Sequence, residues 1–231
     1  MISIKNLHKK FGKLTVLDGL DLEINKGGIF AILGPNGSGK TTLIKCLLGM
    51  VIPNKGEIKI DDKSVLNKWE YRNNLNYLPQ IANFPTNLSV SELINMVKNL
   101  RPKQANEQEL IDLFGLTPFL NKKLGNLSGG TKQKVNLVLT FMFDSELIIL
   151  DEPTTGLDPI ALIHLKELIQ KAKTNGKTIL ITTHIMSVVD EIADEIVFLL
   201  DGKIYFKGSV TALKKQTNQT NLEHAIAELM S

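Results

Sequence analysis

The sequence has a single cysteine among its 231 residues, which excludes a disulfide within the chain and a cysteine-rich zinc site. It also lacks any apolar run near the ~18 residues that a membrane-spanning helix needs. The longest pure runs, such as residues 196–200, have the length of a strand. The first residues lack the basic-then-apolar order of a secretion signal. We therefore expect a soluble, cytoplasmic chain that another protein holds in place if it acts at a membrane.

Neither sign of charge dominates the chain. The 27 lysines and arginines face 24 acidic residues, for a net charge of +3, so a strongly electrostatic nucleic-acid binder is excluded on charge grounds. Hydrophobic residues make up 43% of the sequence, which is enough to form a sizeable core in a chain of this length. A disordered protein has a lower content of hydrophobic residues, so general disorder is excluded. We expect no nucleic-acid partner.

Short apolar runs alternate with helix-like stretches along most of the chain. This alternation predicts an α/β fold in which parallel strands are joined by crossover helices. Strands are expected at residues 2–7, 20–24, 29–33, 57–60, 75–78, 147–150 and 178–182. Residues 195–200 and 203–206 flank Asp201-Gly202 and predict a β-hairpin.

The composition changes between residues 81 and 143, where strand signals are few and helix starts are several. Ser89 or Ser91 can cap one helix, and Asn106 can cap a second that ends at Gly115. We interpret this stretch as a mostly helical insertion in one α/β domain. The predicted parts are a core of residues 1–80 and 144–210, a helical subdomain of residues 81–143, and a tail of residues 211–231 with a polar linker at 214–221 before an amphipathic stretch at 222–230.

Residues 34–41 read Gly-Pro-Asn-Gly-Ser-Gly-Lys-Thr, between a buried strand and a helix. This is the pattern and the context of a phosphate-binding loop, whose glycines let successive N–H groups curl around phosphate oxygens. Lys40 would lie between the β- and γ-phosphates, and the Thr41 hydroxyl would reach Mg²⁺. Candidate nucleotide-binding residues are Gly34, Pro35, Asn36, Gly37, Ser38, Gly39, Lys40, Thr41 and Thr42.

A second half of the site is expected at the end of another buried strand. The apolar run at residues 147–150 ends in Asp151 and Glu152. Alone, this is an ordinary strand followed by a polar turn; downstream of a phosphate loop it predicts a carboxylate pair. We assign Asp151 to the Mg²⁺ shell and Glu152 to accepting a proton from the attacking water.

With these two motifs and several more, residues 1 to about 210 resemble the ATP-binding subunit of an ABC transporter. The further motifs in chain order are Phe11-Gly12, Gln80 after Tyr77-Leu78-Pro79, Leu127-Ser128-Gly129-Gly130, Gly156-Leu157-Asp158-Pro159, and His184 after Thr182-Thr183. They match the adenine-stacking aromatic, the glutamine loop, the signature, the D-loop and the switch histidine of that family. The signature is the most specific, because other phosphate-loop families lack it.

The resemblance implies a P-loop NTPase with a mixed, mainly parallel sheet, an antiparallel β portion and an inserted helical subdomain. It implies ATP and Mg²⁺ as cofactors. Gln80 would contact Mg²⁺ or the water, His184 would contact the γ-phosphate and orient Glu152, and Phe11 would stack on adenine.

The resemblance also implies that one chain holds two half-sites. The residues that would contact the ATP of the other subunit are Ser128, Gly129, Gly130 and Asp158. Hydrolysis would then require a head-to-tail dimer around two ATP molecules, formed by two copies of this chain or by this chain and a similar ATPase. The implied function is to drive a separate transmembrane permease from the inner face of the cell membrane, docked at residues 81–100 or, as the alternative, at residues 222–230.

Two rival functions share part of this pattern. A soluble ABC-type ATPase of translation or DNA repair typically carries tandem ATPase units or a long coiled-coil insertion, and this sequence has one phosphate loop and no heptads. A nucleotide kinase shares the loop but not residues 127–130.

The signature departs from the usual family pattern, since it continues Thr131-Lys132-Gln133-Lys134. With Phe143-Asp144 it resembles the ATPases that accompany nitrous-oxide-reductase maturation and act with a copper-related membrane partner. The six scattered methionines and one cysteine predict no copper site in this chain itself.

Overall fold

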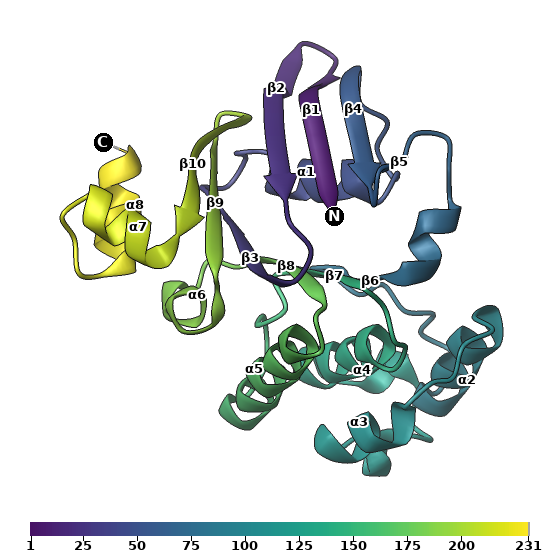
Figure 1. The fold of residues 1–231 in the computed structure, drawn as a ribbon. Helices are drawn as coiled ribbons and strands as arrows, with labels where there is room; N and C mark the ends of the chain where they lie inside the picture. Colours follow the sequence, from purple (N-terminus) through teal and green to yellow (C-terminus); the bar gives the residue numbers. More distant parts are fainter. Residues whose placement is uncertain (231) are drawn as a thin grey trace.

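A computed structural model describes residues 1–230 and folds its strands into two sheets (Figure 1). The first sheet is antiparallel and forms the layer at the top of Figure 1. Its strands, in spatial order, are β2 (Leu14–Ile24), β1 (Ile2–Phe11), β4 (Lys55–Ile60) and β5 (Lys63–Ser64). The predicted strands at residues 2–7 and 20–24 are therefore parts of two longer strands joined by a tight turn.

The second sheet is mainly parallel and carries the predicted site residues. Its order is β10 (Lys203–Ser209), β9 (Glu195–Leu200), β3 (Gly28–Leu33), β8 (Thr178–Thr182), β7 (Leu147–Asp151) and β6 (Leu75–Leu78). Only β10 runs antiparallel to its neighbour, in the predicted hairpin, which is confirmed. The phosphate loop leaves β3, and Asp151 ends β7. The carboxyl ends of parallel strands meet at one edge, so sites far apart in sequence converge there.

Helix α1 (Lys40–Leu47) lies between the two sheets (Figure 1). Its buried side chains Leu43, Ile44 and Leu47 share a core with one face of the parallel sheet and with the antiparallel sheet. Cys46 is buried in the same layer, where burial raises the pKa of its thiol to about 11. This cysteine is therefore a packing residue rather than a reactive thiol.

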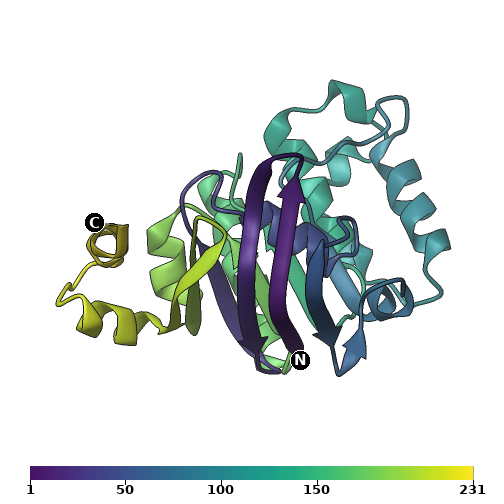
Figure 2. The ribbon, with the colours of Figure 1, turned by 90° about the horizontal axis from the view of Figure 1, so that it is seen from above.

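The other face of the parallel sheet is covered by α4 (Gly129–Phe141), α5 (Pro159–Thr174) and α6 (Met186–Ile192). Helices α2 (Val90–Leu100) and α3 (Glu107–Leu113) extend this layer beyond the sheet (Figure 2). Short 3₁₀ turns occur at Glu70–Asn74, Thr117–Phe119 and Leu124–Asn126. Within residues 1–230, no helix is long and apolar enough to cross a membrane.

Of the two predicted helix caps, the one at Ser89 is present and the one at Asn106 is absent. Ser89 caps α2 in a reciprocal box: its hydroxyl accepts the Glu92 N–H at 3.2 Å, and the Glu92 carboxylate accepts the Ser89 N–H at 2.7 Å. Ser91 lies inside the helix. Asn106 precedes α3, but its side-chain amide donates to the Glu109 carboxylate and makes no cap, so that prediction is wrong in its detail. The helices expected within residues 81–143 are present, and the division into subdomains stays a prediction.

The predicted polar linker at residues 214–221 is wrong over its first part. Helix α7 (Val210–Gln216) begins before it, and α8 (Leu222–Met230) follows after a short turn. Leu213 is fully buried, and Lys214 pairs with Asp190 of α6 at 2.7 Å. The sequence pattern looked polar because most of α7 presents its outer face to solvent. Of the predicted tail, Ser231 lies outside the described residues.

Candidate functional site

The phosphate loop runs from β3 to α1 through backbone shapes that require glycine. Gly34 has φ 148°, and a Cβ there would lie 2.0 Å from the Leu199 carbonyl oxygen. Gly39 has φ 108°, and a Cβ there would lie 2.9 Å from the Val16 oxygen. Both positions exclude any other residue, so the loop is held tightly against β2 and β9. Helix α1 begins at once, and the N–H groups of its first turn are unpaired within the helix and available to an anion.

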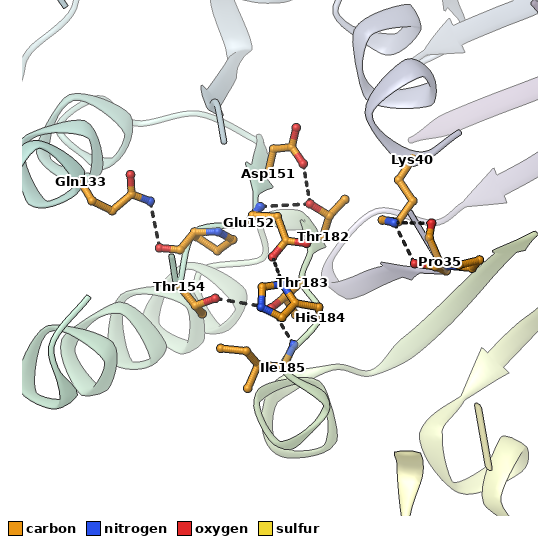
Figure 3. Close-up of polar contacts among 12 residues, drawn as sticks. Pro35, Lys40, Gln133, Asp151, Glu152, Thr154, Thr182, Thr183, His184 and Ile185 are labelled. Carbon is orange, nitrogen blue, oxygen red and sulfur yellow. Dashed lines mark hydrogen bonds and ion pairs between the residues drawn. The ribbon is translucent and has the colours of Figure 1, made fainter. Parts of the chain in front are cut away.

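Lys40 places its ammonium group above this loop. Its Nζ donates to the carbonyl oxygens of Gly34 at 2.8 Å and Pro35 at 3.0 Å (Figure 3). Burial lowers the pKa of Lys40, and the carboxylates of Glu152 and Asp151 oppose that shift. The site therefore contains a partly desolvated cation, for which a polyphosphate is a matching partner.

Ser38 supplies a second sign of an anion site. Its Oγ is buried and has no hydrogen-bond partner among the described residues. A buried hydroxyl without a partner is costly in an ordinary core. A phosphate oxygen in the loop would satisfy it.

A cavity of about 270 Å³ joins the loop to the carboxylates. It is lined by Leu14, Val16, Asn36, Gly37, Gly39, Lys40, Thr41, Thr42, Gln80, Asp151 and Glu152. The hydroxyl of Thr41, the amide of Gln80 and the carboxylate of Asp151 are hard oxygen donors. Mg²⁺ is usually held by few such protein ligands together with water and phosphate oxygens, so the donor set fits this ion.

The apolar wall of this cavity consists of Leu14 and Val16 on β2, two residues that sequence reasoning missed. Phe11 is the last residue of β1 and pairs with Leu14 across the hairpin. Its ring is 49% exposed, and the Lys9 ammonium lies 4.8 Å from the ring centroid. Adenine stacking on Phe11 stays a prediction. The signal for the wall was present as apolar residues directly after the Gly12 turn.

Glu152 follows β7 in an unusual backbone conformation, with φ 52°. The left-handed region costs a non-glycine residue about 1–2 kcal/mol. Its N–H donates to the carbonyl oxygen and to Oγ1 of Thr182, both at 3.0 Å. Its carboxylate Oε2 lies 2.9 Å from Nδ1 of His184 (Figure 3). The side chain of Glu152 is 11% exposed and that of His184 is 76% exposed, so the histidine stands at the open side of a buried carboxylate.

The signature residues lie elsewhere in the same chain. Ser128 caps α4 by accepting the Thr131 N–H at 3.2 Å. Gly130 packs against the D-loop, where a Cβ would lie 2.6 Å from the Gly156 oxygen. Gly129 and Gly130 line a second cavity of about 260 Å³, together with Thr155, Gly156 and Gln80. Gln80 thus borders both cavities, while the phosphate loop borders only the first.

Asp158 has local partners for both of its carboxylate oxygens. It caps α5 by accepting the Ala161 N–H at 2.9 Å, and it pairs with Lys134 at 2.6 Å, which lowers the pKa of Asp158. Gln133 donates to the Pro153 oxygen at 3.0 Å. Gln133 therefore ties α4 to the segment after Glu152, and Lys134 ties it to the D-loop, two contacts that sequence reasoning missed. A contact of Asp158 with a second subunit stays a prediction.

A model of the ABC transporter family matches residues 17–155. The chain belongs to the ABC transporter family. The lantibiotic transport ATP-binding protein SrtF of Streptococcus pyogenes is 34% identical over 227 residues, which cover 96% of this chain and 94% of that protein. The bacitracin transport ATP-binding protein BcrA of Bacillus licheniformis is 33% identical over 233 residues, or 99% of this chain and 76% of that protein.

Solved structures of ABC ATP-binding subunits have the same fold as this chain. The ATP-binding subunit of an ABC transporter has a TM-score of 0.92 at 28% identity, with both chains covered completely. A dimeric ATP-binding cassette in a post-hydrolysis state with ADP and Pi has a TM-score of 0.80 at 26% identity, covering 90% of this chain and 98% of that one. The predicted fold class, family and ATPase activity are confirmed: this ABC chain is an ATP-binding and ATP-hydrolysing subunit. The narrower resemblance to the nitrous-oxide-reductase group stays a prediction.

Proposed function

We propose that this ABC subunit binds Mg²⁺-ATP in its loop cavity and hydrolyses it only when a second chain, in head-to-tail orientation, closes the site. The observation that carries the proposal is the separation of the two cavities. Lys40 and Asp151 border one cavity, and Gly129 and Gly130 border the other. The signature helix lines a different cavity from its own phosphate loop and is therefore available to the loop of a partner, and two-fold symmetry then completes two sites.

Six side chains in or beside the loop cavity have a proposed part in the reaction. The loop N–H groups and Lys40 hold the phosphates, and Thr41, Asp151 and Gln80 hold Mg²⁺, which neutralises charge on the phosphates when bound. Glu152 accepts the proton of the attacking water. His184, in contact with Glu152, orients that carboxylate and donates toward the γ-phosphate.

Replacement of Ser128 by arginine should separate binding from hydrolysis. Arginine places bulk and charge at the shared surface, while the phosphate loop of the same chain is untouched. ATP affinity should stay within about twofold of the parent, and hydrolysis should fall by about 10²-fold or more, the typical effect of removing a donor that stabilises transition-state charge. Calorimetry and a phosphate-release assay measure the two quantities.

Thr211→Arg is the matched control for this variant. Thr211 is an exposed residue on α7, away from both cavities, so the same bulk and charge there should leave hydrolysis at the parent rate. Hydrolysis at the parent rate by Ser128→Arg would contradict the two-half-site arrangement.

We also propose that a transmembrane permease docks on residues 81–100. Ile81 is 71% exposed and follows Gln80, which borders the nucleotide cavity. Met96 and Leu100 are exposed one turn apart on α2, so they present apolar surface on one helix face. The alternative at residues 222–230 exposes less apolar surface to a partner, because Leu222, Ala225 and Ile226 are already buried within this chain. Helices α2 and α8 lie at opposite ends of the molecule (Figures 1 and 2).

Site-specific cross-linking distinguishes the two docking surfaces. A photo-reactive residue at Met96 should capture the permease in native membranes, whereas the same residue at His224, an exposed position on α8, should not. Capture from position 224 alone would move the docking surface to the C-terminal helices.

The captured protein also identifies the transported substrate class, which the ATPase alone does not specify. Relatives of similar match are named for lantibiotic transport, bacitracin transport and L-cystine import.

The transport names of these relatives support a position at the inner face of the cell membrane. We propose that the permease holds the subunit there.

A further inference from the structure

Thr182 ends strand β8 at the point where the catalytic edge of the sheet begins. In the parallel pairing of β7 and β8, its register partner is Asp151. The residue is 1% exposed, and no part of the proposed mechanism uses it. A buried polar side chain at the carboxyl end of a central strand belongs to the region where parallel sheets place their sites.

The Thr182 hydroxyl connects the two carboxylate residues. It donates to Oδ1 of Asp151 at 2.6 Å, because an ionised carboxylate can only accept (Figure 3). Since its single proton is engaged there, the same oxygen accepts the N–H of Glu152 at 3.0 Å. One side chain thus contacts both the proposed Mg²⁺ ligand and the backbone of the proposed general base.

Each contact restrains something the reaction needs. The 2.6 Å distance is that of a charge-assisted hydrogen bond, which holds Oδ1 of Asp151 and leaves Oδ2 directed away from Thr182 (Figure 3). The bond to the Glu152 N–H supports a residue whose φ of 52° is otherwise disfavoured. That backbone conformation aims the Glu152 side chain at His184, with Oε2 and Nδ1 2.9 Å apart.

We propose that Thr182 is a positioning residue that orients Asp151 toward Mg²⁺ and holds the backbone of Glu152. The inference rests on the proposed function, in which Asp151 holds the ion and Glu152 takes the proton. The adjacent Thr183 does not share this role. Its hydroxyl accepts the Ile185 N–H at 3.2 Å and lies 3.5 Å from the Thr154 hydroxyl.

Thr182→Val tests the proposal, because valine keeps the β-branched shape and loses only the hydroxyl. The probe is Mg²⁺ titrated into the chain with the non-hydrolysable β,γ-imido analogue of ATP, followed by calorimetry. The Mg²⁺ concentration for half-maximal analogue binding should rise by about 10- to 100-fold, the usual effect of losing an outer-shell partner of a metal ligand. Analogue affinity with EDTA present should be unchanged. Thr182→Ser, which keeps the hydroxyl, should restore the parent value.

Thr178→Val is the matched control on the same strand. Thr178 is also fully buried, and its hydroxyl accepts the Gly27 N–H at 2.8 Å, at the opposite end of β8. Its valine variant measures the effect of losing a buried hydroxyl without touching the carboxylates, and thermal unfolding compares the stability of the two variants. An equal Mg²⁺ requirement in Thr182→Val and Thr178→Val would overturn the positioning role. Failure of Mg²⁺ to strengthen analogue binding to the parent would instead overturn the proposed metal site, and the inference with it.

Discussion

Glu152→Gln should lower the rate of ATP hydrolysis by about 10²- to 10⁴-fold, the usual effect of losing a general base. Glutamine has nearly the shape of glutamate and can still contact His184, but it cannot take the proton of the attacking water. ATP binding should persist, because the phosphate loop, Lys40 and Asp151 remain in place. A phosphate-release assay measures the rate, and calorimetry measures the affinity.

The same variant should also accumulate as a dimer. In the proposed arrangement, Ser128 and Gly130 of one chain meet the γ-phosphate bound to the other, so ATP favours the closed pair. A ligand that binds only the dimer must stabilise the dimer, and slow hydrolysis lets that state build up. Light scattering should report a monomer without nucleotide, a dimer with ATP, and no dimer with ADP. Adding Ser128→Arg should abolish the dimer.

Glu146→Gln is the matched control for this variant. Glu146 directly precedes β7, is exposed, and pairs with Lys26 at 2.7 Å, far from the carboxyl end of the strand. Its loss should leave hydrolysis and the oligomeric state as in the parent. Full ATPase activity in Glu152→Gln, or a dimer that forms without nucleotide, would contradict the mechanism.

Lys40→Ala should abolish tight ATP binding. The ammonium group is partly buried above the loop, where among residues 1–230 it donates to the Gly34 and Pro35 carbonyl oxygens and to no carboxylate, so its charge is available to phosphates. A hydrogen bond to a charged group contributes about 1.5–3 kcal/mol, which corresponds to a loss of roughly 10- to 150-fold in affinity for each such contact. Calorimetric titration with ATP measures it directly.

The control for Lys40→Ala is Lys45→Ala on the same helix. Lys45 is exposed, lies in the last turn of α1 and does not line the cavity, so its removal should leave ATP affinity unchanged. An equal ATP affinity in Lys40→Ala and the parent would refute the assignment of the loop.

Sequence reasoning succeeded where structure depends on short stretches. The phosphate loop was predictable because a strand, a glycine-rich turn and a helix follow one another within about twenty residues, and each has a local signal. The uniformly apolar run before Asp151 likewise predicts a strand buried on both faces. The cap of α2 at Ser89 depends on two residues three positions apart, and the pattern found it. Helix α3 begins directly after Asn106 as expected, but the predicted cap is absent because the Asn106 side chain donates to the Glu109 carboxylate instead.

By itself, the sequence determined the family, the phosphate loop and the carboxylate pair at the end of a buried strand, because each depends on short motifs of neighbouring residues. Only the tertiary structure decided what lies beside them. The pairing of β7 with β8 brings Thr182 onto Asp151 and Glu152, and α4 brings Lys134 onto Asp158. Leu213 is buried in the core, although the polar residues around it in the sequence predicted an exposed linker. These contacts join segments separated by 24 residues or more, as in the Lys134–Asp158 pair, and such distances are closed by sheet register and helix packing rather than by local preference.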